Sequence, residues 1–156
     1  MATEAQTADP AGFEIDRAAH TLRFVRQLAA PREAVFDAWT TPEQLTCWWD
    51  AAGEPLTECE VDLRPGGGFR FVSPGHSHMA FTGTYLLIDR PERLEFEALD
   101  ALGRVVLEET GGGTRMTVEI VCNSDDHLEH YVKLGVAKGT SATCDNLVAF
   151  IASRSA

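Results

Sequence analysis

One stretch near the start of the chain has a clear helical pattern: APREAVFDAWTTPEQLTCWW, residues 30–49. Pro31 and Pro42 each suit the first turn of a helix, because a residue there needs no backbone N–H for the helical hydrogen bonds. Apolar side chains follow each proline at the spacing of one helix face. The stretch therefore predicts two short consecutive helices, over residues 32–40 and 42–49.

The residues on both sides of this stretch alternate between apolar and polar, which is the pattern of β-strands. One strand is expected before the stretch, over residues 21–28. Six more are expected after it, at residues 56–63, 68–72, 79–88, 93–99, 104–110 and 115–122. The alternation is typical of an antiparallel sheet with one face in the core and the other in solvent.

The C-terminal part of the chain has the pattern of one long helix, over residues 125–153. Ser124 or Asn123 is expected to cap its first turn. Gly135 and Gly139 fall on or near its apolar face, where a glycine costs about 1 kcal/mol relative to alanine. Two interpretations are open. Either the helix starts late or kinks at these glycines, or the missing side chains leave space between the helix and the sheet.

The order of the elements is a strand, two short helices, six strands and a long helix, which indicates an α+β fold with a curved antiparallel sheet. A curved sheet around one amphipathic helix leaves a gap, and small molecules commonly bind in such gaps. Residues 1–12 have no periodic pattern and are expected to form a disordered tail, whereas residues 13–156 are expected to form a single domain.

The charge balance excludes several classes of partner. The chain has 156 residues, with 13 Lys and Arg against 24 Asp and Glu, and a formal net charge of −11. The negative electrostatic field of such a chain repels nucleic acids and anionic membrane surfaces, so neither is an expected partner. No apolar run reaches the ~20 residues of a membrane-spanning helix, and the N-terminus lacks the pattern of a secretory signal. The scattered cysteines favour free thiols and a cytoplasmic protein.

Four motifs, in sequence order, resemble those of the START-like (SRPBCC) superfamily. Within this superfamily they most resemble the branch of homologues of the activator of the heat-shock-90 ATPase. They are the stretch at residues 30–49, Asp62–Phe71 (DLRPGGGFRF), Phe81–Tyr85 (FTGTY) with Pro91–Leu94 (PERL), and Gly112–Thr117 (GGTRMT). The resemblance extends over about residues 22–151.

This resemblance implies a helix-grip fold, in which about seven antiparallel strands hold a long C-terminal helix around an apolar cavity. It also implies a hydrophobic ligand, because members of the superfamily bind lipids, polyketides or other hydrophobic molecules. Some members are cyclases or hydrolases, and some are co-chaperone domains. One position departs from the family pattern, because Thr140 follows Gly139 where the family often has tryptophan. The loss of a large ring is expected to alter that end of the cavity.

The apolar faces of the expected strands and of the last helix predict the lining of such a cavity. The predicted residues are Trp48, Phe69, Phe71, Met79, Phe81, Tyr85, Phe96, Met116, Val118, Tyr131, Gly135, Val136 and Gly139. Alternation along a strand puts Phe69 on the same face as Phe71, and Phe81 on the same face as Tyr85. The alternative is that these side chains fill a solid core.

Polar groups in the cavity would orient a ligand, and the candidates are Arg64, His78 and His130. Acid–base catalysis would need a titratable group with a pKa shifted by burial. The sequence offers several without a reason to choose among them: His78, His130, Tyr85, Tyr131 and Asp145. No motif for nucleophilic catalysis or phosphate binding is present, and no catalytic residue is assigned.

Two histidine pairs have spacings that suit a shared metal ion, His76 with His78 and His127 with His130. No motif supplies a third ligand to either pair. Neither a metal nor another cofactor is therefore expected.

Three functions follow as hypotheses. The first is binding of a small hydrophobic or aromatic molecule in a cavity between the sheet and the C-terminal helix. The second is a cyclase- or hydrolase-like reaction on such a ligand, and the third is a module that contacts a chaperone. Formation of a homodimer is left open.

Overall fold

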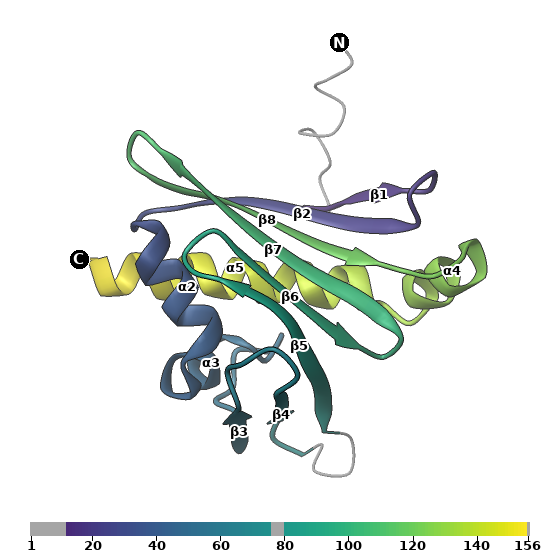
Figure 1. Ribbon diagram of the computed structural model, residues 1–156, viewed down its shortest axis with the longest axis horizontal. Helices are drawn as coiled ribbons and strands as arrows, with labels where there is room; N and C mark the ends of the chain where they lie inside the picture. The colour runs from purple at the N-terminus through teal and green to yellow at the C-terminus, as the bar shows by residue number, and fades with distance from the viewer. Residues whose placement is uncertain (1–11, 76–79, 156) are drawn as a thin grey trace.

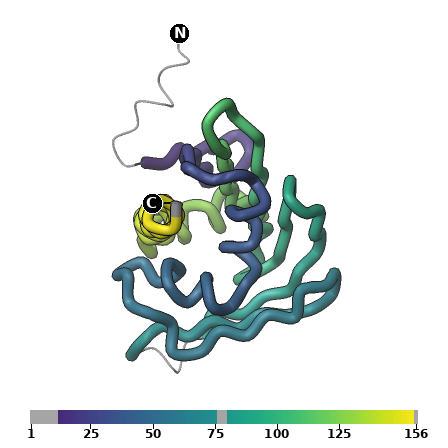
Figure 2. Tube along the Cα trace, turned by 90° about the vertical axis from the view of Figure 1, so that its left-hand side faces the viewer, coloured from purple at the N-terminus to yellow at the C-terminus, as the bar shows by residue number. Residues whose placement is uncertain are grey.

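In the computed structural model, which describes residues 12–75 and 80–155, an antiparallel sheet curves around the long C-terminal helix (Figure 1, Figure 2). The strands are β1 (Glu14–Asp16), β2 (Thr21–Leu28), β3 (Glu58–Val61), β4 (Gly68–Val72), β5 (Phe81–Asp89), β6 (Arg93–Ala98), β7 (Ala101–Thr110) and β8 (Gly113–Val121). The helices are α2 (Arg32–Thr40), α3 (Pro42–Trp48), α4 (Asp125–Lys133) and α5 (Val136–Ser155). Within the described residues, no helix combines the length and the apolar character needed to cross a membrane.

The strands lie in the order β1-β2-β8-β7-β6-β5-β4-β3, and every neighbouring pair is antiparallel. From β3 to β8, each strand pairs with the next one along the chain, whereas α2 and α3 carry the chain from β2 to β3 at the opposite edge. The sequence predicts about seven strands, and the described residues form eight, because β1 pairs with residues 21–23 of β2. Three residues are too few to show an alternating pattern in a sequence.

Some boundaries differ from the prediction. β3 is shorter than the expected strand over residues 56–63, because the backbone N–H of Leu56 bonds to the carbonyl of Thr46 near the end of α3 (3.1 Å). The expected start of β5 at Met79 lies outside the described residues. Residues 1–11 of the expected tail also lie outside them, whereas the carbonyl of Gly12 accepts a hydrogen bond from Arg26 Nη1 (2.8 Å).

The predicted C-terminal helix is divided in two, which corrects the prediction of one helix over residues 125–153. Gly135, between α4 and α5, has a φ of +81°, a left-handed conformation that glycine adopts at little cost. The interpretation that the helix breaks at a glycine therefore holds at Gly135. It does not hold at Gly139, which lies within α5. Ser124 caps α4 as predicted, because its Oγ accepts a hydrogen bond from the backbone N–H of His127 (3.1 Å).

The two short helices join to each other and to the concave face of the sheet through tryptophans. The indole N–H of Trp48 on α3 donates to the carbonyl of Ala38 on α2 (3.0 Å). The indole N–H of Trp39 reaches Met116 Sδ on β8 (3.3 Å). Trp39 and Trp48 are themselves in edge contact, with ring centroids 4.9 Å apart. These contacts fix α2 and α3 over one half of the sheet.

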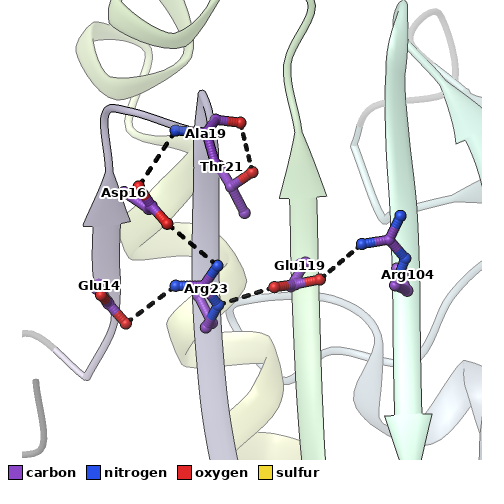
Figure 3. Close-up of polar contacts among 7 residues, drawn as sticks. All are labelled: Glu14, Asp16, Ala19, Thr21, Arg23, Arg104 and Glu119. Carbon is purple, nitrogen blue, oxygen red and sulfur yellow. Dashed lines mark hydrogen bonds and ion pairs between the residues drawn. The ribbon is translucent and has the colours of Figure 1, made fainter.

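The convex face of the sheet carries a row of ion pairs across neighbouring strands (Figure 3). Arg23 on β2 donates through Nε to Glu119 on β8 (2.8 Å) and through Nη1 to Glu14 on β1 (3.2 Å). Glu119 also accepts from Arg104 Nη1 on β7 (2.9 Å). Burial raises the pKa of the Glu119 carboxyl, but the hydrogen bonds from the two guanidinium groups outweigh burial, so the pKa is lowered overall.

Replacing each of the two glycines by alanine is expected to have opposite effects. An added Cβ meets nothing at either position. Gly139→Ala should therefore raise the free energy of unfolding by about 0.5–1 kcal/mol through helix propensity. Gly135→Ala should lower it by about 1–2 kcal/mol, because a positive φ strains any L-residue. Urea unfolding measures both, and a stable Gly135→Ala variant would contradict the break at this residue.

The ion pairs predict a pH-dependent contribution from Glu119. A carboxyl with a lowered pKa stabilises the fold above the pKa of the unfolded chain, about 4.3, and this contribution disappears as the pH falls through the folded pKa. Glu119→Gln should therefore lower the free energy of unfolding by about 1 kcal/mol at pH 7, with a difference that shrinks below about pH 4. Urea unfolding across this range measures the difference. Glu97→Gln makes the same substitution at an exposed position of β6 outside this row of ion pairs and provides the control.

Candidate functional site

A pocket of about 420 Å³ lies between α5 and the concave face of the sheet. α5 packs along β2 and against α3 and α4, so its attachment to the sheet is on one side. The pocket occupies the other side, and its sheet wall comes from β5, β6, β7 and β8. The exposed residues Ala51 and Leu99 border it, so it opens to solvent.

The helix wall of the pocket consists mostly of small side chains. α5 presents Val136, Gly139, Thr140, Thr143 and Cys144. Gly139 has open space where a side chain would begin. Thr140, where the resemblance leads us to expect a tryptophan, borders the pocket with a much smaller side chain. Because these side chains are small, they leave the space between α5 and this part of the sheet unfilled.

The sheet wall combines apolar rings with small residues. Phe81, Phe96, Val118 and Ile120 supply the larger side chains, while Ala98, Ala101 and Gly103 leave room beside them. Gly103 pairs with Phe96 across β6 and β7, and a Cβ on Gly103 would lie 2.6 Å from ring atoms of Phe96. The ring of Phe96 therefore lies flat against the sheet over the bare backbone of Gly103 and forms part of the pocket wall.

One end of the pocket is bordered by Tyr131 of α4 and the turn between β6 and β7. The turn residues Leu99 and Asp100 both have positive φ, of 52° and 64°. The Tyr131 hydroxyl donates a short hydrogen bond to the carbonyl of Leu99. This bond ties the hairpin tip to α4, so the wall is fixed although Leu99 itself is exposed.

The other end of the pocket is formed by the segment that follows α3. Thr143 Oγ1 on α5 donates to the carbonyl of Trp49 (3.1 Å), and Asn146 Nδ2 donates to the carbonyl of Asp50 (2.9 Å). Trp49 also contacts Phe81, with ring centroids 5.3 Å apart. These contacts hold Trp49 and Asp50 at the pocket, together with Ser73 beyond β4.

The structure brings part of the predicted lining to the pocket. Phe81, Phe96, Val118, Tyr131, Val136 and Gly139 border it. Other predicted residues are buried beside it in an aromatic core: Trp48, Phe69, Phe71, Tyr85 and Met116. In that core Phe69 stacks on Phe71 at 5.0 Å, and it also contacts Tyr85 at 5.2 Å. Gly135 is exposed at the α4–α5 junction, and Met79 lies outside the described residues.

The predicted polar groups mostly lie elsewhere. Arg64 is exposed and forms an ion pair with Asp62 (3.0 Å) in the turn before β4. His130 is exposed on α4. Neither borders the pocket. His78 lies outside the described residues. Asp145 pairs with Arg26 on β2 (2.8 Å).

Of the two histidine pairs, the structure describes only His127 and His130, and it groups no third ligand with them. His76 and His78 are outside the described residues, and Nδ1 of His127 accepts the backbone N–H of Asn123 (3.0 Å). In residues 12–75 and 80–155, no three His, Cys, Asp or Glu side chains are grouped so that they could hold a metal ion.

Several residues at the pocket were not predicted from the sequence. The sequence predicts Trp48 in the lining, but Trp49 borders the pocket instead, because two consecutive tryptophans point in different directions and only the placement of α3 decides which one meets it. Trp39 on α2 also borders the pocket, and its helical pattern indicates only that it is buried. Ala98 and Gly103 were missed because a small residue carries no positive signal for a cavity. A helical projection of α5 would have placed Thr143 beside the predicted Gly139.

The ionisable groups at the pocket are poorly suited to acid–base catalysis. Burial raises the pKa of the Tyr131 phenol, and it raises the pKa of the Cys144 thiol to about 12, so both stay protonated at neutral pH. The Glu119 carboxylate is bound by Arg23 and Arg104 on the other face of the sheet. Asp50 is the remaining carboxylate among the described lining residues.

All four cysteines are free, as their scattered positions predict. Cys47 is exposed and Cys59 is half-buried, whereas Cys122 and Cys144 are buried. Cys144 is therefore a small, uncharged part of the pocket wall.

Comparison with known proteins gives the same fold. A family model described as Activator of Hsp90 ATPase homolog 1-like protein matches residues 29–152. A solved structure from Rhodobacter sphaeroides is 27% identical over 86% of this chain and 93% of its own, with a TM-score of 0.77. One from Nitrosomonas europaea is 25% identical over 86% and 96%, with a TM-score of 0.78. No curated protein matches the chain.

A third structure shows the fold alone. It is an AHSA1-like protein from Aeromonas hydrophila, 24% identical over 86% of this chain and 94% of its own, with a TM-score of 0.71.

The contact between Gly103 and Phe96 predicts a coupled pair of substitutions. Gly103→Ala should lower the free energy of unfolding by about 1–3 kcal/mol, because the new Cβ forces the Phe96 ring to move. In a Phe96→Leu background the same change should cost less, because the ring is gone. A double-mutant cycle by urea unfolding measures the coupling. Additive effects would show that the ring does not lie against Gly103.

Proposed function

We propose that this chain, which belongs to the Activator of Hsp90 ATPase homolog 1-like family, binds a small hydrophobic or aromatic molecule. The binding site is the pocket between the sheet and α5. The fold is the helix-grip fold of the START-like superfamily, which commonly binds hydrophobic ligands. The observation that supports the proposal is the pocket itself, with apolar walls on both the helix and the sheet.

The size of the pocket favours a compact ligand. A volume of about 420 Å³ lies in the lower part of the range of small-molecule sites, about 300–1,000 Å³. Burial of apolar ligand surface would drive binding at about 25 cal/mol per Å², before the costs of ordering the ligand. A molecule with one fused ring system fits these limits better than a lipid with two chains.

The walls are held in place before any ligand arrives. Trp49 packs against Phe71 with ring centroids 5.0 Å apart, and Phe96 packs edge-on against Phe69 at 5.5 Å. Wall residues supported from behind lose little conformational freedom when a ligand binds. The hydroxyls of Ser73 and Thr140 make no hydrogen bond to a described residue, so they are available to a polar group of the ligand.

A catalytic function has less support. Four of the titratable groups that the sequence offers lie in the described residues: His130, Tyr85, Tyr131 and Asp145. Of these four only Tyr131 borders the pocket, and its hydroxyl already donates to Leu99. Tyr85 is buried in the aromatic core, where burial raises its pKa. No described surface feature specifically favours the third hypothesis, contact with a chaperone.

Substitution of Thr140 tests the proposal. N-phenyl-1-naphthylamine, an uncharged aromatic dye that fluoresces in apolar surroundings, should show saturable binding to the wild-type protein. Thr140→Trp should weaken it at least about tenfold, since the new ring occupies the pocket. Ala149→Trp adds the same ring to an exposed position of α5 and serves as the control, with unchanged affinity.

The opposite result is also well defined. If neither this dye nor any of a panel of uncharged aromatic compounds and lipids binds or raises the melting temperature, the pocket is not a binding site for such molecules.

A further inference from the structure

The charges around the pocket have one sign. Asp50 and Glu119 are the ionic residues among the described lining, which contains no Lys, Arg or His. Glu119 is neutralised by Arg23 and Arg104 on the convex face of the sheet. Asp50 is therefore the one charged group that the described lining offers to a ligand.

The backbone around Asp50 holds its carboxylate in a defined position. Asp50 Oδ2 accepts the backbone N–H groups of Ala52 (3.1 Å) and Glu54 (3.3 Å). Asn146 on α5 holds the carbonyl of Asp50 at the same time (2.9 Å). Oδ1 of Asp50 receives no hydrogen bond from a described residue, so one carboxylate oxygen remains available. Asp50 is half-buried and next to the exposed Ala51, which places it at the rim of the pocket.

The guanidinium of Arg26, on the inner side of β2, is already engaged by α5. Arg26 donates to Asp145 (2.8 Å) and to Ser141 Oγ (2.8 Å) on α5, and Arg26 does not border the pocket. An anionic group in the pocket would therefore find no described basic side chain. Burial of an unpaired carboxylate carries a large desolvation cost.

The aromatic walls favour the opposite charge. Trp39, Trp49, Phe81, Phe96 and Tyr131 border the pocket, and the faces of such rings are electronegative. A cation close to an aromatic face gains about 0.5–2 kcal/mol, more when water is excluded. The net charge of −11 also concentrates cations around the molecule.

We propose that the ligand of this pocket is an aromatic or alicyclic amine, bound as a monocation with its ammonium group beside Asp50 and its apolar body between α5 and the sheet. This inference rests on the proposed function, since it names the chemical class of the same ligand. The pocket then selects against carboxylates of the same shape, including fatty acids, because its described lining offers no basic partner and Asp50 repels them.

Three compounds with one skeleton separate charge from shape. They are 2-(aminomethyl)naphthalene, 2-(hydroxymethyl)naphthalene and 2-naphthoate, which at neutral pH are cationic, neutral and anionic. Affinities come from competition with N-phenyl-1-naphthylamine and from calorimetry. The amine should bind about tenfold more tightly than the alcohol, a difference of about 1.4 kcal/mol, and the carboxylate more weakly than either.

Substitution of Asp50 assigns the preference to one residue. Asp50→Asn should reduce the amine-to-alcohol affinity ratio about tenfold. The asparagine oxygen can still accept the N–H groups of Ala52 and Glu54, so the local turn is preserved. Glu109→Gln removes one negative charge from an exposed site on β7 and should leave the ratio unchanged. If Asp50→Asn does not fold, Asp50→Ser provides the second variant, and the three compounds on the wild-type protein still decide whether the ligand is a cation.

The outcomes separate this inference from the proposed function. If the alcohol binds and the carboxylate binds as tightly as the amine, the charge preference is wrong and the apolar pocket stands. Equal loss of the ratio in Asp50→Asn and Glu109→Gln would assign the preference to net charge and overturn the role of Asp50. If none of the three compounds binds while N-phenyl-1-naphthylamine does, the inference fails and the proposed function stands.

Discussion

The one-sided attachment of α5 is the constraint on which the rest of the structure depends. Arg26 on β2, only 13% exposed, binds Asp145 and Ser141 of α5, and the helix packs along β2 and against α3 and α4. A helix tied to one side of a curved sheet cannot also reach the strands on the other side. The small residues Gly139, Thr140 and Thr143 face that side, so the space between helix and sheet stays open. With large side chains in these positions, the same fold would have a continuous core.

The sheet supports this pocket by keeping its two faces chemically separate. On the convex face, Arg23, Glu119 and Arg104 bridge neighbouring strands by ion pairs (Figure 3). On the concave face, the rings of Trp49 and Phe96 line the pocket while other rings pack behind them. A pocket wall supported in this way keeps its shape without a ligand, which is the condition for selective binding at low cost in conformational entropy.

Charge gives the pocket a chemical preference that its apolar walls alone would lack. Apolar walls discriminate poorly between molecules of similar shape, because a methylene group is worth only about 1 kcal/mol. A single carboxylate at the rim adds a term that depends on the sign of the ligand's charge. Asp50 can have this effect because Glu119 is neutralised from the far side of the sheet, whereas Oδ1 of Asp50 receives no hydrogen bond from a described residue.

The local patterns of the chain predicted most of its elements, because helix periodicity, strand alternation and caps such as Ser124 depend on neighbouring residues. The motifs that predicted the helix-grip fold are also short local stretches, so they too can be recognised in the sequence. Which of the predicted aromatic residues reach the pocket was decided by the tertiary structure. Trp48 and Tyr85 are buried in the core, while Trp49 and Phe96 border the space, because that outcome depends on the curvature of the sheet and the position of α3. The sequence by itself determined the order of elements and the small residues of α5. Only the packing of distant segments placed Asp50 beside aromatic rings, since the charge pattern of a linear sequence does not show which groups are neutralised and which face a pocket.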